Sequence, residues 1–339
     1  MIIINDVVDQ QLEATNKDKS TKFSRELTRF WPTDCSCQIL NKTFGKCARE
    51  MYFSVNNTTS SNPISARGLR ICEAGSMYED KEIERVKNIK YYKDSAVKFN
   101  FIIPETNITI AGKLDIVYQI DDKIIGGEIK SGYGYTFKSQ VFNTTTTPGM
   151  PVIKHLMQVM MYLYYFKYVD TTMGIDEFYL TYIDRGDCEN IQFSIKLTED
   201  DYPIIEIEGI NQQFIMKNVN LNNGYLFDQN PKGKRELNKV NKIYNKLKYY
   251  EISIKNIFDR FKYIADYVNR KELPPKDYKY IYTPEDIELM FSSGEINETK
   301  YEKLKESNGI ERDFQCTYCN YLKKCISADK ITYKDMVSI

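Results

Sequence analysis

The chain has 339 residues, of which 42% are hydrophobic and 28% charged, and this composition is typical of a globular protein with a sizeable core. Lysine plus arginine equals aspartate plus glutamate at 47 each, so no overall basic field draws the protein to nucleic acid, and any such contact must use a local patch. The longest apolar run, residues 159–166, is too short to span a bilayer, and the first residues lack the basic flank of a signal peptide, so we expect a cytoplasmic protein without membrane contact.

The first half of the chain predicts a lead-in, a helical region and a β-hairpin. Residues 1–44 are expected to form an N-terminal arm, and residues 67–88 carry apolar side chains among charged ones, as in one or two amphipathic helices. Residues 108–120 and 123–130 are β-branched runs separated by Asp121-Asp122, a turn-forming pair, and they predict a hairpin. Residues 132–150 are rich in Gly, Ser and Thr and predict a mobile loop over it.

The second half alternates helix and strand patterns. Residues 152–168 predict a buried helix, residues 177–183 and 191–197 two strands, and residues 233–270 a long helix stopped by the prolines that come after it. This order indicates an α/β fold with a central mixed sheet flanked by helices, followed by a C-terminal helical segment with cysteines. We expect a core over residues 45–270 and a C-terminal segment over residues 271–339 whose cysteines pack back on Cys47.

The hairpin carries the first candidate site. Side chains alternate along a strand, so Glu128 and Lys130 share one face, Ile129 packs on the other, and Asp115 can lie beside the first two. Two carboxylates held together repel unless a cation joins them, and their oxygen atoms suit Mg²⁺ or Mn²⁺, while a nearby lysine can position the attacking water. Solvated charges at strand ends are the ordinary alternative. The glycine pair before Glu128 favours a site, because glycines are tolerated where a ligand or backbone approaches closely.

Two helical segments supply further candidates. Gln158 and Tyr162 are four residues apart on one face of an apolar helix, and a buried glutamine needs hydrogen-bond partners. Those partners could be a phosphate, the carboxylates of the hairpin, or only the backbone of the core. Glu79 could reach the hairpin as a third metal ligand, although its acidic neighbours also fit a charged surface. The single histidine, His155, rules out a catalytic triad or zinc-hydrolase motif built on several histidines.

Cysteines form the second candidate site. Three of them lie in a Cys-x2-Cys-x5-Cys array, Cys316, Cys319 and Cys325, in a polar aromatic segment where metal binding is expected. Three thiolates leave one ligand missing, and Cys47 is preferred for this place. Four thiolates satisfy either a tetrahedral zinc or a 4Fe-4S cluster, so ligand chemistry leaves both open.

The remaining four cysteines are assigned other roles. Cys35 and Cys37 are rivals of Cys47 for the fourth ligand position, and Cys72 and Cys188 are expected to be packing residues.

Several motifs together resemble a known family. They occur in this order along the chain: Cys47 with Arg49 and Tyr52, Gly75 to Glu79, Asp115, Glu128-Ile129-Lys130, Gln158 to Tyr162, and the three C-terminal cysteines. They resemble the PD-(D/E)XK nucleases of the RecB-like branch, and more narrowly its iron-sulfur exonucleases, which include the AddB nuclease domain, CRISPR-associated nucleases and phage relatives. The resemblance covers residues 45–327. Leu114 stands where the name-giving proline would be, and Glu79 stands where many relatives carry a histidine.

The resemblance implies a role for each matching residue. Asp115 and Glu128 would bind the catalytic metal, within a metal group that also includes Glu79 and Ile129. Lys130 would orient the nucleophilic water, and Gln158 with Tyr162 would support the site and the DNA. Cys47, Cys316, Cys319 and Cys325 would hold a 4Fe-4S cluster, and the fold would be a restriction-endonuclease-like core.

The expected function is therefore metal-dependent hydrolysis of DNA, with an exonuclease on single-stranded or end-bearing DNA favoured over an endonuclease on branched or double-stranded DNA. The alternative is a catalytically silent DNA-binding or assembly module with structural zinc. The basic residues between positions 232 and 248 are a candidate DNA contact, although a solvated helix face is the commoner explanation. No phosphate-cradling Walker motif occurs, so a helicase or recombination partner would be a separate protein.

Overall fold

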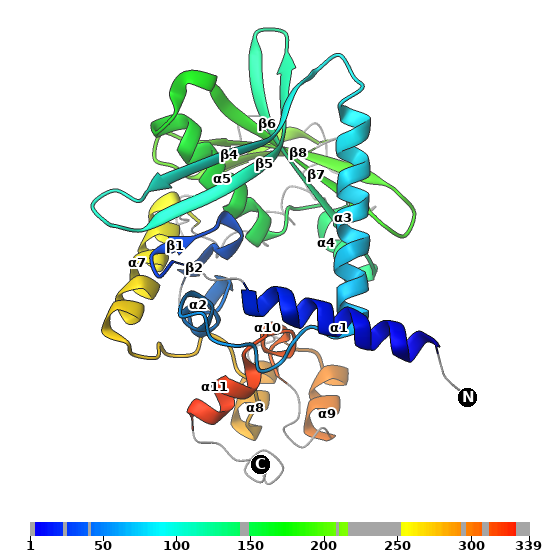
Figure 1. Cartoon of the computed structure of the whole chain (residues 1–339), viewed down its shortest axis with the longest axis vertical. Helices are drawn as coiled ribbons and strands as arrows, with labels where there is room; N and C mark the ends of the chain where they lie inside the picture. The colour runs from blue at the N-terminus through cyan, green and yellow to red at the C-terminus, as the bar shows by residue number, and fades with distance from the viewer. Residues whose placement is uncertain are drawn as a thin grey trace. The chain divides into compact units, whose positions relative to one another are not determined.

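The computed structural model describes residues 4–22, 26–39, 42–142, 149–207, 210–215, 252–292, 296–306 and 312–329. The chain divides into two compact units (Figure 1). The smaller unit combines residues 1–27, 46–69 and 266–339, and the larger unit combines residues 28–45 and 70–265. The division differs from the boundaries predicted at residues 44 and 270, since residues 28–45 belong with the sheet of the larger unit.

The larger unit is built on a mixed eight-stranded sheet. The strand order is β1-β5-β6-β7-β8-β9-β10, with β4 also paired to β5. The pairs β1–β5 and β6–β7 are parallel and the others antiparallel. The strands are β1 (Arg29–Phe30), β4 (Tyr92–Ile102), β5 (Thr109–Ile120), β6 (Lys123–Gly132), β7 (Ile175–Asp184), β8 (Asn190–Leu197), β9 (Pro203–Ile207) and β10 (Ile210–Ile215). The prediction of an α/β fold with a mixed central sheet is confirmed.

The predicted hairpin is formed by β5 and β6. Ile120 pairs with Lys123, and the turn residue Asp121 adopts a positive φ of 53°. The glycine pair within β6 has a physical reason: a Cβ on Gly126 would lie 2.2 Å from the Phe178 ring, and one on Gly127 would lie 2.6 Å from the Tyr118 ring. Because successive positions of a strand face opposite sides, a neighbouring aromatic ring lies across β6 on each face of the sheet. The glycine pair was expected to allow the close approach of a ligand or backbone. In the structure, aromatic rings of the protein itself approach the two glycines.

Helices cover both faces of the sheet (Figure 1). Helix α5 (Ile153–Tyr168) packs on one face, where the rings of Tyr162 and Phe178 have centroids 5.5 Å apart. Helix α3 (Ala66–Val86) packs on the other face, where its apolar side chains lie against Ile116 and Ile129. The helix predicted over residues 152–168 is confirmed, and the pattern over residues 67–88 forms one continuous helix.

Two other predicted segments differ from the structure. The loop expected over residues 132–150 contains a helix, α4 (Tyr135–Val141), and its residues 143–148 lie outside the described residues. Of the helix expected over residues 233–270, the structure describes α7 (Ile254–Arg270). The basic cluster between positions 232 and 248 lies outside the described residues.

Strand β4 was not predicted from the sequence. A register shift between Tyr92 and Asp94 and the positive φ of 57° at Ala96 interrupt the period-two pattern by which a strand is recognised. Only Phe99 and Phe101 near its end are buried on alternate positions. A small two-stranded sheet, β2 (Ser36–Ile39) and β3 (Lys42–Gly45), also belongs to the larger unit.

The smaller unit is helical. Its apolar cluster consists of Tyr282, Ile287 and Leu304, from the segment of α8 and α9. Its helices are α1 (Ile4–Lys22), α2 (Ala48–Val55), α8 (Pro284–Ser292), α9 (Glu298–Glu306), α10 (Phe314–Thr317) and α11 (Leu322–Ala328). Among the helices that the described ranges contain, in either unit, none has the length and apolar character needed to cross a bilayer.

Candidate active site and thiol cluster

The acidic residues of the hairpin meet where β5 and β6 separate. The ladder between the two strands ends at the pair Ile116 and Gly127, so Asp115 is the first residue beyond it. One Asp115 carboxylate oxygen, Oδ2, accepts a hydrogen bond from the peptide N–H of Ile129 at 3.0 Å. The Oε1 atom of Glu79, from α3, accepts one from the peptide N–H of Ser131 at 3.2 Å. Two peptide donors on one edge of β6 thus position two carboxylates from different elements.

Glu128 is the buried centre of this group. Its side chain is 2% exposed, and its Oε1 atom accepts hydrogen bonds from the ammonium of Lys130 and from Nε2 of Gln158, the latter at 2.6 Å. Its second oxygen, Oε2, is buried and has no hydrogen-bond partner within the described part of the chain. A buried carboxylate oxygen without a partner is costly, so this atom is the clearest point at which a further group could bind.

Gln158 and Tyr162 connect Glu128 to the rest of the sheet. The Nε2 atom of Gln158 also donates to the Tyr162 hydroxyl at 2.6 Å, and that hydroxyl donates to the carbonyl oxygen of Lys113 at 3.4 Å. The buried glutamine therefore finds its hydrogen-bond partners in a network of side chains. One partner is a carboxylate of the hairpin, which was one of the three predicted alternatives. Because both residues are nearly fully buried in α5, the network holds Glu128 in one position.

Burial dominates the electrostatics of the group. It raises the pKa of Glu128 to about 7, against the opposing effect of Lys130, and it also raises the pKa of Asp115 and of Glu79. Burial lowers the pKa of Lys130, but the nearby Glu128, Asp115 and Glu79 raise it by more, so the ammonium stays protonated. Three carboxyl groups thus share one ammonium, and a bound cation would favour their charged forms.

The donor set fits a hard divalent cation in chemistry. Asp115, Glu128 and Glu79 offer carboxylate oxygens, which Mg²⁺ and Mn²⁺ prefer, and Oε2 of Glu128 has no competing partner among the described residues. Across the described ranges, no three histidine, cysteine, aspartate or glutamate side chains are grouped closely enough to share one ion. The carboxylates would therefore have to move together around a bound ion. Ile129, which the resemblance places in the metal group, has its side chain 1% exposed in an apolar cluster and contributes its peptide N–H to Asp115.

The raised pKa of Glu128 makes metal-free stability depend on pH. The folded pKa lies above the unfolded value, so the folded protein binds more protons between them, and stability is lost as pH rises through about 7. We expect the melting temperature of wild-type protein in EDTA to fall between pH 6 and pH 8 by more than that of Glu128→Gln, whose neutral amide does not titrate. Calorimetry of both proteins at each pH checks this. An equal fall in the two proteins would contradict it.

The thiol cluster lies within the smaller unit. Cys47 immediately precedes α2, and it lines one small cavity together with Cys316, Cys319 and Cys325. The cavity volume is about 20 Å³, close to the space for a single water. The four thiols line this space without being grouped closely enough to share one ion among the described residues, so a single ion or a four-iron cluster would require them to move. The structure therefore brings the four predicted cysteines together.

Two sulfur atoms of the thiol cluster accept hydrogen bonds. Arg49 donates through Nη1 to Sγ of Cys325 at 3.3 Å and to Oδ1 of Asp329 at 2.8 Å. The peptide N–H of Tyr321 donates to Sγ of Cys319 at 3.4 Å. Donors of this kind stabilise thiolates and the sulfur atoms of metal clusters. Asp329 was missed in the sequence, although its position four residues after Cys325 on a helix is a usable signal.

Burial and neighbouring negative charges raise the pKa of Cys47, Cys316 and Cys319. Burial, then Asp277, raises the pKa of Cys47 to about 11. Burial raises the pKa of Cys316 and Cys319 to about 12, and neighbouring thiols of the cluster add to both shifts. Thiolates packed this closely need a cation to compensate their charge, and four thiolate donors suit zinc or iron.

The other four cysteines belong to the larger unit. Cys35 and Cys37, the rivals for the fourth position, are fully buried in the larger unit. Cys72 and Cys188 are exposed, so the prediction that they pack in the core is wrong. The positive φ of 63° at Cys188 places it in the turn after β7. His155 forms a hydrogen bond through Nδ1 with the Tyr182 hydroxyl at 3.1 Å and lies near the start of α5.

Comparison with solved structures gives a weak likeness. No family model and no curated protein matches the chain. Among solved structures, one described as "Crystal structure of SSO0001" is similar with a TM-score of 0.35 and 16% identity, over 55% of this chain and 76% of that one. A likeness of this size carries no argument about fold or function, so the function has to be inferred from the residues of the site itself.

Proposed function

We propose that this chain is a metal-dependent DNA nuclease. The observation that carries the proposal is the buried Glu128, which has Lys130 and Gln158 on one oxygen, no partner on the other among the described residues, and Asp115 and Glu79 on the same strand edge. Carboxylates gathered around an ammonium suit hydrolysis of a phosphodiester. The order of the motifs along the chain, which resembles the RecB-like nucleases, supports DNA as the substrate.

The residues of the site have distinct roles in this proposal. Asp115, Glu128 and Glu79 would hold Mg²⁺ or Mn²⁺. When bound, such an ion supplies charge neutralisation at the scissile phosphate and lowers the pKa of water. Lys130, protonated beside these carboxylates, orients the attacking water or a phosphate oxygen. Gln158 and the peptide N–H of Ile129 fix the carboxylates in place, which reduces the reorganisation needed during the reaction.

Aromatic side chains after β6 favour a substrate with unstacked bases. Tyr133 is 71% exposed and Tyr135 is 88% exposed, and both come after the strand that carries Glu128 and Lys130. Exposed aromatic rings are platforms on which the bases of single-stranded DNA stack without sequence preference. This favours an exonuclease on single-stranded or end-bearing DNA over an endonuclease on double-stranded DNA.

The thiol cluster has a structural role in the proposal. Cys47, Cys316, Cys319 and Cys325 would hold a 4Fe-4S cluster, with Zn²⁺ as the alternative, and Arg49 supports it by its hydrogen bond to Cys325. The metal would tie residues near the start of the chain to residues near its end within one unit. Opening of DNA would be supplied by a separate helicase or recombination protein.

The test is degradation of labelled DNA by the purified full-length chain. We expect end-labelled linear single-stranded DNA to be degraded with Mn²⁺ or Mg²⁺ and to survive in EDTA. Circular single-stranded DNA of the same sequence is the matched control and should survive. Cutting of the circular DNA would overturn the exonuclease assignment but would still support nuclease activity. No metal-dependent loss of any DNA would overturn the proposed function.

A further inference from the structure

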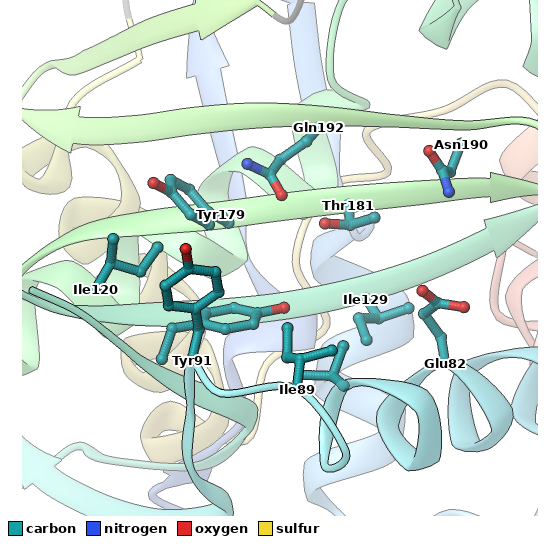
Figure 2. Close-up of a pocket in the computed structure, with 11 residues that line it drawn as sticks. Glu82, Ile89, Tyr91, Ile120, Ile129, Tyr179, Thr181, Asn190 and Gln192 are labelled. Atoms are coloured by element: carbon teal, nitrogen blue, oxygen red, sulfur yellow. The ribbon is translucent and has the colours of Figure 1, made fainter.

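A cavity lies on the sheet face opposite Glu128 and Lys130, and the proposed reaction does not use it (Figure 2). Its volume is about 370 Å³, which is within the usual range for small-molecule sites. It is formed by α3, the segment directly after α3, and strands β5 to β8. The lining includes Glu82, Tyr91, Tyr118, Tyr179, Thr181 and Gln192.

Tyrosine rings form the walls of this cavity. The rings of Tyr118 and Tyr179 have centroids 5.9 Å apart at an angle of 47°. Tyr118 is held down on β6 because Gly127 has no Cβ, which would otherwise lie 2.6 Å from the ring. Tyr91 is 36% exposed, and Figure 2 shows it and Tyr179 projecting into the same space. Tyr118 and Tyr179 contact each other as a tilted pair, so a planar aromatic ligand would stack on the ring faces that line the cavity and not between the two rings.

Polar side chains form a row beside the rings. Thr181 and Gln192 are directly opposite each other in the β7–β8 ladder, and Asn190 is two residues before Gln192 on the same face. A hydroxyl and two amides offer both hydrogen-bond donors and acceptors. The edge of a nucleobase carries the same mixture, and proteins read unstacked bases by stacking them on aromatic rings and bonding their edges.

The charges of the lining residues indicate which part of a nucleotide could bind in the cavity. Of the eleven lining residues, Glu82 alone is charged, and its carboxylate is paired with Arg85 at 2.8 Å. No lysine or arginine is among the described residues that line the cavity, and the ammonium of Lys90 lies 4.7 Å from the centroid of the Tyr91 ring. A base with its sugar suits this lining, and a phosphate would have to remain outside it.

We infer that this cavity binds a nucleobase, stacked against Tyr118 and Tyr179 with its edge on Thr181 and Gln192. The base comes either from a free nucleoside or from a strand whose phosphates stay outside the cavity. The side chain of Ile129 lines the cavity, and its peptide N–H donates a hydrogen bond to Asp115. The same residue therefore borders both the cavity and the acidic site. The inference does not rest on nuclease activity and holds if the chain cleaves nothing.

Calorimetric titration in EDTA tests this with four probes, adenosine, guanosine, cytidine and thymidine, and with a trinucleotide of the best-bound base. The full-length protein is expected to bind at least one nucleoside saturably, with a Kd below about 1 mM. If the trinucleotide binds more tightly than the nucleoside, the base comes from a strand; if it binds equally or less tightly, the free nucleoside is the ligand. Absence of saturable binding by all four nucleosides would overturn the inference.

Matched variants locate the binding. Tyr179→Leu removes a stacking ring, Gln192→Leu removes an edge contact, and Gly127→Ala pushes the Tyr118 ring into the cavity. Each is expected to weaken binding about tenfold or more. Tyr168→Leu, at the end of α5 on the other face of the sheet, is the control and should bind as wild type. Wild-type affinity in both Tyr179→Leu and Gln192→Leu, with melting curves showing them folded, would overturn the assignment to this cavity.

Discussion

Replacing Asp115 by asparagine or Lys130 by methionine is expected to reduce metal-dependent DNA degradation on the order of a thousandfold. Asparagine can still accept the hydrogen bond from the Ile129 peptide at the place of Asp115 Oδ2, but it removes the negative charge that a metal ion needs. Methionine keeps much of the length of Lys130 and removes the ammonium that lies on Glu128. The measurement is the initial rate of loss of end-labelled single-stranded DNA with Mn²⁺.

Glu84→Gln is the matched control for these variants. Glu84 lies on α3 like Glu79, but its side chain is 63% exposed and paired with Lys81, so its replacement should leave the rate unchanged. Circular dichroism and melting curves separate lost chemistry from lost folding. If both Asp115→Asn and Lys130→Met degrade DNA at the wild-type rate, the assignment of the active site is wrong, whatever activity the chain has.

Cys47→Ser is expected to remove the metal of the thiol cluster and to destabilise the smaller unit. Cys47 is separated from Cys316 by 316 − 47 = 269 residues, and a link across a loop of that length removes about 5 kcal/mol of chain entropy from the unfolded state. Without the metal, the smaller unit relies on apolar clusters such as that of Tyr282, Ile287 and Leu304. We therefore expect loss of bound metal together with a large fall in melting temperature.

Anaerobic purification decides which metal is bound. Iron, zinc and acid-labile sulfide are measured per chain, and the visible absorbance is recorded. Iron with sulfide and a brown colour supports the 4Fe-4S cluster, and zinc in a colourless protein supports the alternative. Cys72→Ser, which alters an exposed cysteine, is the control and should keep the metal. Unchanged metal content in Cys47→Ser would show that Cys47 is not a ligand.

Local sequence patterns were sufficient to predict a helix or hairpin when the pattern lies within one continuous segment. The hairpin was predicted because β-branched runs flank Asp121-Asp122, and α5 because apolar residues run through residues 152–168 at helical spacing. Strand β4 was missed because its pairing is irregular at Tyr92 and Asp94, and because its residues are buried on alternate positions only at Phe99 and Phe101.

By itself the sequence determined the order of the elements and which side chains could carry chemistry. Alternation along β6 separates Glu128 and Lys130 from Ile129, and the cysteine spacing marks a thiol cluster. Only the tertiary structure decided how these residues meet, because contacts between distant segments depend on strand pairing and packing. The separation of β5 from β6 frees two peptide donors for Asp115 and Glu79, and the packing of α5 brings Gln158 to one oxygen of Glu128. The chain path that places Cys47 with Cys316, while Cys35 and Cys37 stay buried in the other unit, was likewise decided by the fold.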